Sequence, residues 1–220
     1  LSHLLNNDES HHAKHEHRHG HPYVDAHAKE LVREINAQSL DPSASRRVPH
    51  DVYGLAKLMG GKKPFIDKLQ MVFDEGLYDP ANEPDIAYAH LFSYFKGEEW
   101  RTQKETQRLL DKYFTTKPDG IPGNDDTGTM SSWAIFNMIG FYPDCPGLPE
   151  YTLTTPVFNK VTIRLDPKWY KENELVIETN RTQPGVLYIN KVLLNGKKFN
   201  KYHITHDELV HGKYLKFDLK

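Results

Sequence analysis

The spacing of apolar residues predicts a series of helices over about residues 48–140. Apolar side chains recur every three or four positions, which is the period of a helix with one buried face. The segments are VPHDVYGLAKLMGG, KPFIDKLQMVFDEG, EPDIAYAHLFSYFKG, EEWRTQKETQRLLDKYF and GTMSSWAIFNMIG. Asp51 stands where an N-cap is expected, Pro64 and Pro84 stand near helix starts, and Gly140 follows a helix end. Because the connections are short, successive helices are expected to pack antiparallel.

After Phe141 the period changes from that of a helix to that of a strand. YTLTTPVFNKVTIRL alternates around Val161, Ile163 and Leu165, and ELVIETN, VLYINKVLL and YLKFDL follow. The Asn195-Gly196 pair is typical of a tight hairpin turn. Helices followed by strands indicate an α+β fold. The sequence therefore predicts helices over residues 48–142 and an antiparallel β region over residues 143–220.

The first 47 residues differ from the rest. Most of the 13 histidines fall within residues 1–27. Residues 1–22 show no apolar period and are expected to form a mobile tail, whereas DAHAKELVREINA predicts a helix over 25–37. Histidine-rich tracts can bind transition metals, but the irregular spacing here favours adventitious binding over a specific site. We therefore interpret residues 1–47 as a divergent, partly disordered segment.

Charge and hydropathy exclude several classes of function. A formal net charge of −2 does not indicate a basic surface that would bind nucleic acid or an anionic membrane. No apolar run approaches the ~20 residues that span a bilayer. The N-terminus LSHLLNNDES lacks the basic-then-apolar order of a secretory signal.

Three connections between the helices carry most of the side chains that could perform chemistry. They are His50 and Asp51, Asn82 and Glu83, and Asn124, Asp125 and Asp126 of the stretch GIPGNDDTGTMSSW. If alternate helix ends share a rim, these groups converge. Their oxygen atoms suit a hard cation such as calcium, and a carboxylate that activates water is the base needed in sugar hydrolysis.

Structural roles compete with these chemical ones. Asp51 and Asp126 are each placed to cap a helix, and Glu83 is placed to interact with a helix dipole. His50 fits a packed or hydrogen-bonded structural histidine. For the adjacent Asp125 and Asp126, the residues alone leave open whether the loop caps a helix or holds a metal or a water.

Longer motifs show a family resemblance. VPHDVYGLAKLMGG, ANEPDIAYAHLFSYFKGEEWRTQ, DGIPGNDDTGTMSSWAIFNMIGFYPDCPG and YTLTTPVFNKVTIRL follow one another as in glycoside hydrolase family 92, and the chain resembles that family over about residues 48–219. The resemblance implies a calcium-dependent, inverting exo-α-mannosidase that joins a β-sandwich to an (α/α)6 barrel. This chain then resembles the last helices of a partial (α/α)6 barrel, followed by the closing strands.

The resemblance also implies partners and a location. The expected substrates are terminal α-mannosides, most often α-1,2-linked, on N-glycans or mannan-type oligosaccharides. The expected location is extracytoplasmic, either periplasmic or secreted. A partial barrel exposes apolar helix faces, which favours self-association through those helices.

Residue roles follow the same resemblance. Asn82 and Glu83 match the asparagine-glutamate pair at the calcium site. Asp126 matches the general base, with Asn124 and Asp125 beside it. The pair at 50–51 matches a segment near the site and is expected to bind substrate.

The match fails at the general acid. The family carries this group on the glutamate of a Tyr-Glu-Gly segment shortly before VPHD, where this chain has INAQSLDPSASRR. Glu34 and Asp41 are nearby but sit in no matching motif. Two alternatives to an active enzyme therefore remain, a calcium- and mannose-binding module without turnover and an inactive fragment.

Overall fold

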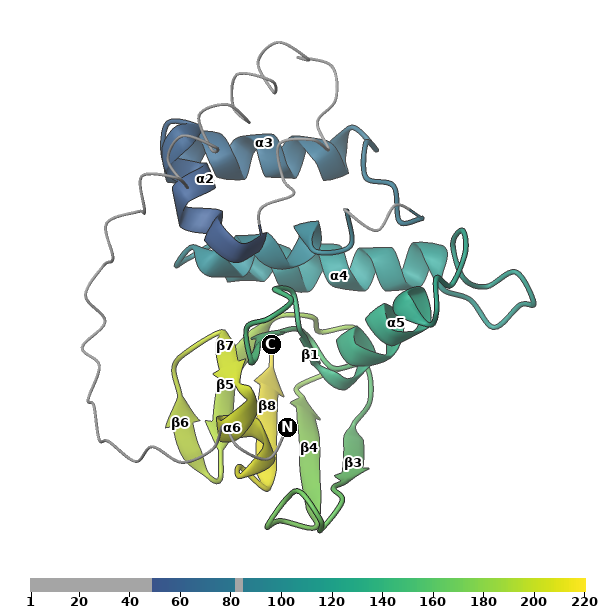
Figure 1. The fold of residues 1–220 in the computed structure, drawn as a ribbon, viewed down its shortest axis with the longest axis vertical. Helices are drawn as coiled ribbons and strands as arrows, with labels where there is room; N and C mark the ends of the chain where they lie inside the picture. Colours follow the sequence, from purple (N-terminus) through teal and green to yellow (C-terminus); the bar gives the residue numbers. More distant parts are fainter. Residues whose placement is uncertain (1–48, 82–84) are drawn as a thin grey trace, which may run out of the picture.

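A computed structural model describes residues 49–81 and 85–220, and within these ranges helices precede strands (Figure 1). The helical elements are η2 (Pro49–Asp51), α2 (Val52–Leu58), α3 (Lys62–Asp74), η4 (Tyr88–Tyr94), α4 (Glu99–Tyr113) and α5 (Thr129–Ile139). Figure 1 shows α2 and α3 on one side of α4 and the strands on the other. The α+β class is confirmed. The helix predicted over 25–37 and the tail predicted over 1–22 lie outside the described residues.

The first two α-helices begin and end as the sequence predicts. The Asp51 side chain accepts a hydrogen bond from the N–H of Gly54 at 2.8 Å and so caps α2. Gly61, at φ 109°, is the N-cap of α3. The predicted apolar stripe of α3 is buried, including Phe65 and Leu69, which are each 1% exposed.

The helix predicted near residues 84–97 is a short 3-10 helix instead. All residues from Tyr88 to Ser93 are buried, so η4 has no solvent-facing side. Side chains of neighbouring elements also donate hydrogen bonds to carbonyl groups of η4. The Tyr53 hydroxyl donates to the Tyr94 carbonyl at 2.8 Å, and the Thr102 hydroxyl donates to the His90 carbonyl at 3.4 Å. Tertiary contacts therefore replace part of the regular helical pattern.

The strands form two sheets. One has the order β1-β2-β7, from β1 (Phe141–Tyr142), β2 (Glu150–Leu153) and β7 (His203–Thr205). The other has the order β3-β4-β8-β5-β6, from β3 (Lys160–Arg164), β4 (Glu174–Arg181), β8 (Tyr214–Leu219), β5 (Ile189–Leu194) and β6 (Lys197–Phe199). The expectation of an antiparallel region needs one correction, because β4 and β8 pair in parallel. β8 enters between β4 and β5, which run in opposite directions, so it must be parallel to one of them.

Two details of the strand region went beyond the sequence prediction. The stretch YTLTTPVFNKVTIRL is divided between β2 and β3, which belong to different sheets and are separated at Pro156. The short helix α6 (His206–Val210) was not predicted, although Thr205 and Glu208 form a capping box at its start. The predicted turn is present, since Asn195 (φ 50°) and Gly196 (φ 77°) connect β5 to β6.

Two apolar cores meet at β1. Tyr142 belongs to the core of the helices, and Phe141 belongs to the core of the strands. Successive strand residues face opposite sides, so one short strand serves both cores. Phe136 of α5 packs against both. A domain boundary near residue 142 remains a prediction.

In the part of the chain that the structure describes, no helix has the length and apolar character needed to cross a membrane.

Candidate functional site

The aspartate pair lies on the loop that leads into α5, and Asp125 is bound to the first turn of that helix. Its Oδ1 accepts the N–H of Ser131 at 2.7 Å, and its Oδ2 accepts the Ser131 hydroxyl at 2.9 Å. The Asp125 carbonyl accepts the N–H groups of Gly128 and Met130 at 3.0 and 3.3 Å. Asp125 therefore satisfies free donors at the helix start. The N-cap position of α5 is Gly128, and the carboxylate contact to the helix start considered for Asp126 is made by Asp125.

The carboxylate of Asp126 is left free by this arrangement. Only its backbone carbonyl is engaged, accepting the N–H and the hydroxyl of Thr129 at 3.3 and 2.7 Å. The residue is exposed, and within the described ranges no hydrogen bond involves its carboxylate. Of the two adjacent acids, Asp126 is thus the one available to a bound molecule or water.

The backbone at this point is strained. Asp126, Thr127 and Gly128 have φ values of 44°, 60° and 93°, a run of left-handed residues. Left-handed conformation costs a β-branched residue such as Thr127 roughly 1–2 kcal/mol, whereas aspartate adopts it more readily. Such strain persists only where surrounding contacts enforce it, and it concentrates at functional sites. The hydrogen bonds of Asp125 and Thr129 supply that enforcement.

A close backbone approach brings a second connection to this loop. A Cβ added to Gly123 would lie 2.5 Å from the Cβ of Ala81, so only glycine allows the contact. Ala81 directly precedes Asn82 in the sequence. On the other side of that segment, the indole N–H of Trp133 in α5 donates to the Ile86 carbonyl at 2.9 Å. Asn82 and Glu83 lie outside the described residues, but α5 and the loop before it contact the chain on either side of them.

The segment before Asn82 is fixed by two aspartates. Asp79 Oδ1 accepts the N–H of Ala81 at 2.9 Å. Asp85, which is 1% exposed, accepts the N–H of Asp79 at 3.0 Å. These bonds hold the two ends of the connection against each other.

The third predicted group is not brought to the aspartate pair. Asp51 caps α2, and His50 is exposed. Figure 1 shows α2 near one end of α4, whereas residues 114–128 follow its other end. Asn124, by contrast, is exposed on the same loop as Asp125 and Asp126. The roles of all these residues stay predictions.

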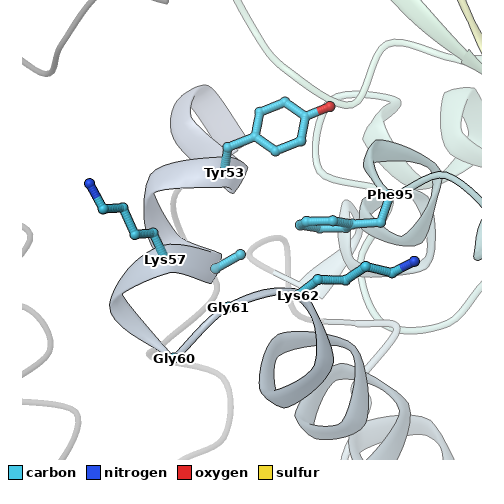
Figure 2. A pocket seen from close by; sticks show the side chains of 7 residues that line it. Tyr53, Lys57, Gly60, Gly61, Lys62 and Phe95 are labelled. Atoms are coloured by element: carbon cyan, nitrogen blue, oxygen red, sulfur yellow. The ribbon is translucent and has the colours of Figure 1, made fainter.

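A pocket of about 550 Å³ lies elsewhere, between the turn that joins α2 to α3 and the ring of Phe95 (Figure 2). Its polar groups are already used. Tyr53 donates to a carbonyl of η4, and Lys62 Nζ lies 3.1 Å from Glu98 Oε1. Figure 2 shows the Lys57 side chain directed away from Phe95. This pocket offers no convergent free polar groups for a substrate.

No metal centre is formed by the described residues alone, because they contain no group of three or more histidine, cysteine or acidic side chains suited to a metal ion. Asn82 and Glu83, outside the described ranges, would add an amide and a carboxylate oxygen. Those are the donor types that Ca²⁺ takes.

Sequence reasoning missed Thr129 and Ser131, the residues that hold the aspartate loop. Both lie in the first turn of α5, where free N–H groups face the preceding residues. A hydroxyl in that turn, following a pair of aspartates, is a local signal that could have indicated the contact. The approach of Gly123 to Ala81 had no such local signal.

Comparisons with known proteins show the family of the chain. The profile of the glycosyl hydrolase family 92 catalytic domain matches residues 11–220, so the match begins well before the VPHD motif at residue 48. An uncharacterized secreted glycosidase of Arthroderma benhamiae is 30% identical over 172 residues, covering 78% of this chain and 22% of its own length.

Two solved structures from Bacteroides thetaiotaomicron are similar as well. One is a family GH92 alpha-mannosidase, with a TM-score of 0.73 and 32% identity. The match covers 80% of this chain and 24% of the mannosidase chain. The same mannosidase was also solved in complex with mannoimidazole. The other is a family GH92 inverting mannosidase, with a TM-score of 0.69 and 32% identity, covering 80% and 26%. The chain thus spans about a quarter of the length of these relatives.

Proposed function

Because this chain belongs to glycosyl hydrolase family 92, whose catalytic-domain profile covers residues 11–220, we propose that its protein hydrolyses terminal α-mannosides. The mannosidases of similar structure support the choice of sugar. The proposed substrates are α-1,2-linked residues on N-glycans or mannan-type oligosaccharides. The proposed stereochemical course is inversion, and the similar inverting mannosidase of Bacteroides thetaiotaomicron supports it.

The observation that carries the proposal is the free, exposed carboxylate of Asp126 beside the fixed carboxylate of Asp125. Asp126 takes a proton from a water as the water oxygen bonds to the anomeric carbon. The bond from that carbon to the leaving oxygen breaks, and the leaving oxygen receives a proton from a general acid. In an inverting enzyme the base and acid carboxyl groups stand ~6.5–9.5 Å apart to admit the water. We assign the acid to no residue of this chain.

Calcium is part of the proposal, with Asn82 and Glu83 as its ligands. When bound, the ion would supply positive charge that orients sugar hydroxyl groups. The contacts of Gly123 with Ala81 and of Trp133 with Ile86 support this assignment, because they join the ends of the ligand segment to the Asp126 loop and α5.

The proposed location is extracytoplasmic. Its support is the fungal relative, which is described as secreted.

A binding module without turnover is a second candidate function. The absence of a Tyr-Glu-Gly segment before VPHD favours it, since that segment would carry the acid. Such a module would retain mannose and release none.

The test is mannose release from α-1,2-mannobiose, with calcium and with a chelator. We expect Asp126→Asn to lower kcat about 10²- to 10⁴-fold, the contribution of a general base, and we expect the chelator to abolish release. Asp119→Asn, an exposed aspartate nearby before the same helix, is the control and should retain activity. Full activity of Asp126→Asn would refute the base assignment. Mannose binding without release would favour the binding module.

A further inference from the structure

Two hydroxyl groups of α5 fix the residues on which the proposed base depends. Ser131 binds both oxygens of the Asp125 carboxylate, through its N–H at 2.7 Å and its hydroxyl at 2.9 Å. The Thr129 hydroxyl binds the Asp126 carbonyl at 2.7 Å. Asp126 is therefore held from both sides while its own carboxylate stays free.

These contacts hold the backbone in its left-handed conformation and oppose its relaxation. The left-handed run from Asp126 to Gly128 would relax if its anchors were removed, because strain of this kind persists only when neighbours enforce it. Relaxation at Asp126 would redirect its side chain. A displacement of ~1 Å at a reacting group can reduce a rate about 10²-fold.

We propose that Ser131 is a positioning residue for the Asp126 base, acting through Asp125. This inference rests on the proposed function. Only the hydroxyl of Ser131 is removed by substitution with alanine, because the amide bond to Asp125 Oδ1 comes from the backbone. The variant should therefore loosen the loop without removing the cap altogether.

The experiment compares Ser131→Ala with Ser131→Thr, which keeps the hydroxyl, and with Ser132→Ala, a control at the exposed neighbouring residue. We expect Ser131→Ala to lower kcat on α-1,2-mannobiose by about 10- to 100-fold at nearly unchanged KM. Ser131→Thr should restore most of the rate, and Ser132→Ala should resemble the unsubstituted protein. Adding Ser131→Ala to Asp126→Asn should cause no further loss, since residues that act as a unit are not additive.

The outcomes separate this inference from the proposed function. If Asp126→Asn is inactive but Ser131→Ala is fully active, only the positioning role is wrong. An additive loss in the double variant, or a parallel fall in the unfolding midpoint, would also overturn it. Full activity of Asp126→Asn, or no release by the unsubstituted protein, would overturn both.

In a different part of the molecule, a row of polar side chains crosses the three-stranded sheet. Tyr142 stands opposite Thr152, and Thr152 stands opposite His203. Opposed residues share one face of a sheet. η4 covers this face, with the His90 ring stacked 4.4 Å from Tyr142 and the Tyr94 ring edge-on 4.7 Å from His203.

Unpaired polar atoms concentrate at this contact. Asp144 is 4% exposed and accepts the Thr152 hydroxyl through Oδ1 at 2.7 Å. Among the described residues, the buried side-chain atoms without a well-formed hydrogen bond are Asp144 Oδ2, His90 Nδ1, Ser93 Oγ, His203 Nε2 and Thr179 Oγ1, although the Tyr94 hydroxyl also interacts with the Asp144 carboxylate. All but the last belong to this contact. Because buried polar groups are normally hydrogen-bonded, the cluster needs an explanation beyond packing.

Burial also decides the charge of the two imidazoles. It lowers the pKa of His90 and of His203, and the nearby Asp144 carboxylate opposes that shift at both. Glu150 and Glu99 also face His203 and act in the same direction as Asp144. The Nε2 of His90 is paired with Asn137 Oδ1 at 2.9 Å. Asn137 and the backbone of Ala87 and Ile86 favour the charged imidazole, so the lowered pKa of His90 is due to burial.

We infer that the contact between η4 and the three-stranded sheet is an acid-sensitive latch, closed while His90 and His203 are uncharged. Exposed histidines titrate near pKa ~6.5. Burial lowers the pKa of His90 and His203 below that value. The closed contact therefore has its full stability above about pH 6.5, and this stability is lost as the pH falls toward the lowered pKa values of the two histidines.

The test is urea unfolding of the protein between about pH 8 and about pH 5. The midpoint should fall on acidification, and His203→Gln should reduce that fall by about half, because one of two buried imidazoles is gone. Ser132→Ala, which removes an exposed hydroxyl and no titratable group, is the control and should show the full fall. NMR titration of the native imidazoles keeps the test decisive if His203→Gln fails to fold. A His203 that titrates at or above the ordinary pKa, or an unchanged pH dependence in the variant, would overturn the inference.

Discussion

At the scale of single residues, identical side chains have different tasks because the backbone places them differently. Asp125 and Asp126 are adjacent, yet one caps α5 and the other presents a free carboxylate from a left-handed residue. The sequence located the pair and its chemistry. It did not show which member caps the helix, because that depends on φ and on a serine hydroxyl six residues further on.

Asp51 allows the capping role to be separated from a substrate-binding role. We expect Asp51→Ala to lower the free energy of unfolding by about 1 kcal/mol, the usual cost of a lost N-cap. Asp51→Ser should keep the bond to the Gly54 N–H and most of the stability. Urea unfolding measures both variants.

Activity then decides the second role of Asp51. If the carboxylate also binds substrate, Asp51→Ser raises KM at retained stability. An unchanged KM would leave Asp51 as a cap alone.

At the scale of elements, the helices and most strands follow from local patterns, but their docking does not. Gln103, on the buried side of α4, is 2% exposed and accepts the N–H of Ile189 at 2.9 Å. This bond joins α4 to β5 across 86 positions. The sequence near residue 103 does not indicate this partner, because a glutamine in a helix rich in charged residues is usually predicted to be exposed.

Removing that bond should weaken the attachment of the helices to the sheet. We expect Gln103→Leu to cost about 1–3 kcal/mol, because the buried Ile189 N–H is left without an acceptor. Gln107→Leu is a control on the same helix, where the side chain donates to exposed Asp111 at 2.8 Å. Chemical unfolding would measure both, and equal stabilities would argue against a docking role for Gln103.

At the scale of the whole molecule, the two cores are joined by a few shared residues and a polar contact. Phe136 packs against both cores, and β1 contributes one residue to each. The proposed latch lies at this same boundary, so loosening it would act on the position of the helices relative to the strands. Self-association through exposed helical side chains such as Tyr53 and Ile135, which are 61% and 58% exposed, stays a prediction.

The sequence by itself determined the α+β order, the starts and ends of α2 and α3, the hairpin at Asn195-Gly196 and the family. These features depend on short-range periodicity, on caps and turns, and on motifs several residues long. Only the tertiary structure decided the 3-10 form of η4, the parallel pairing of β4 with β8, the approach of Gly123 to Ala81 and the division of labour between Asp125 and Asp126. Each of these features depends on groups distant in the sequence or on a backbone conformation that neighbouring contacts impose. Long-range contacts and imposed conformations produce no periodic pattern of apolar residues from which they could be predicted.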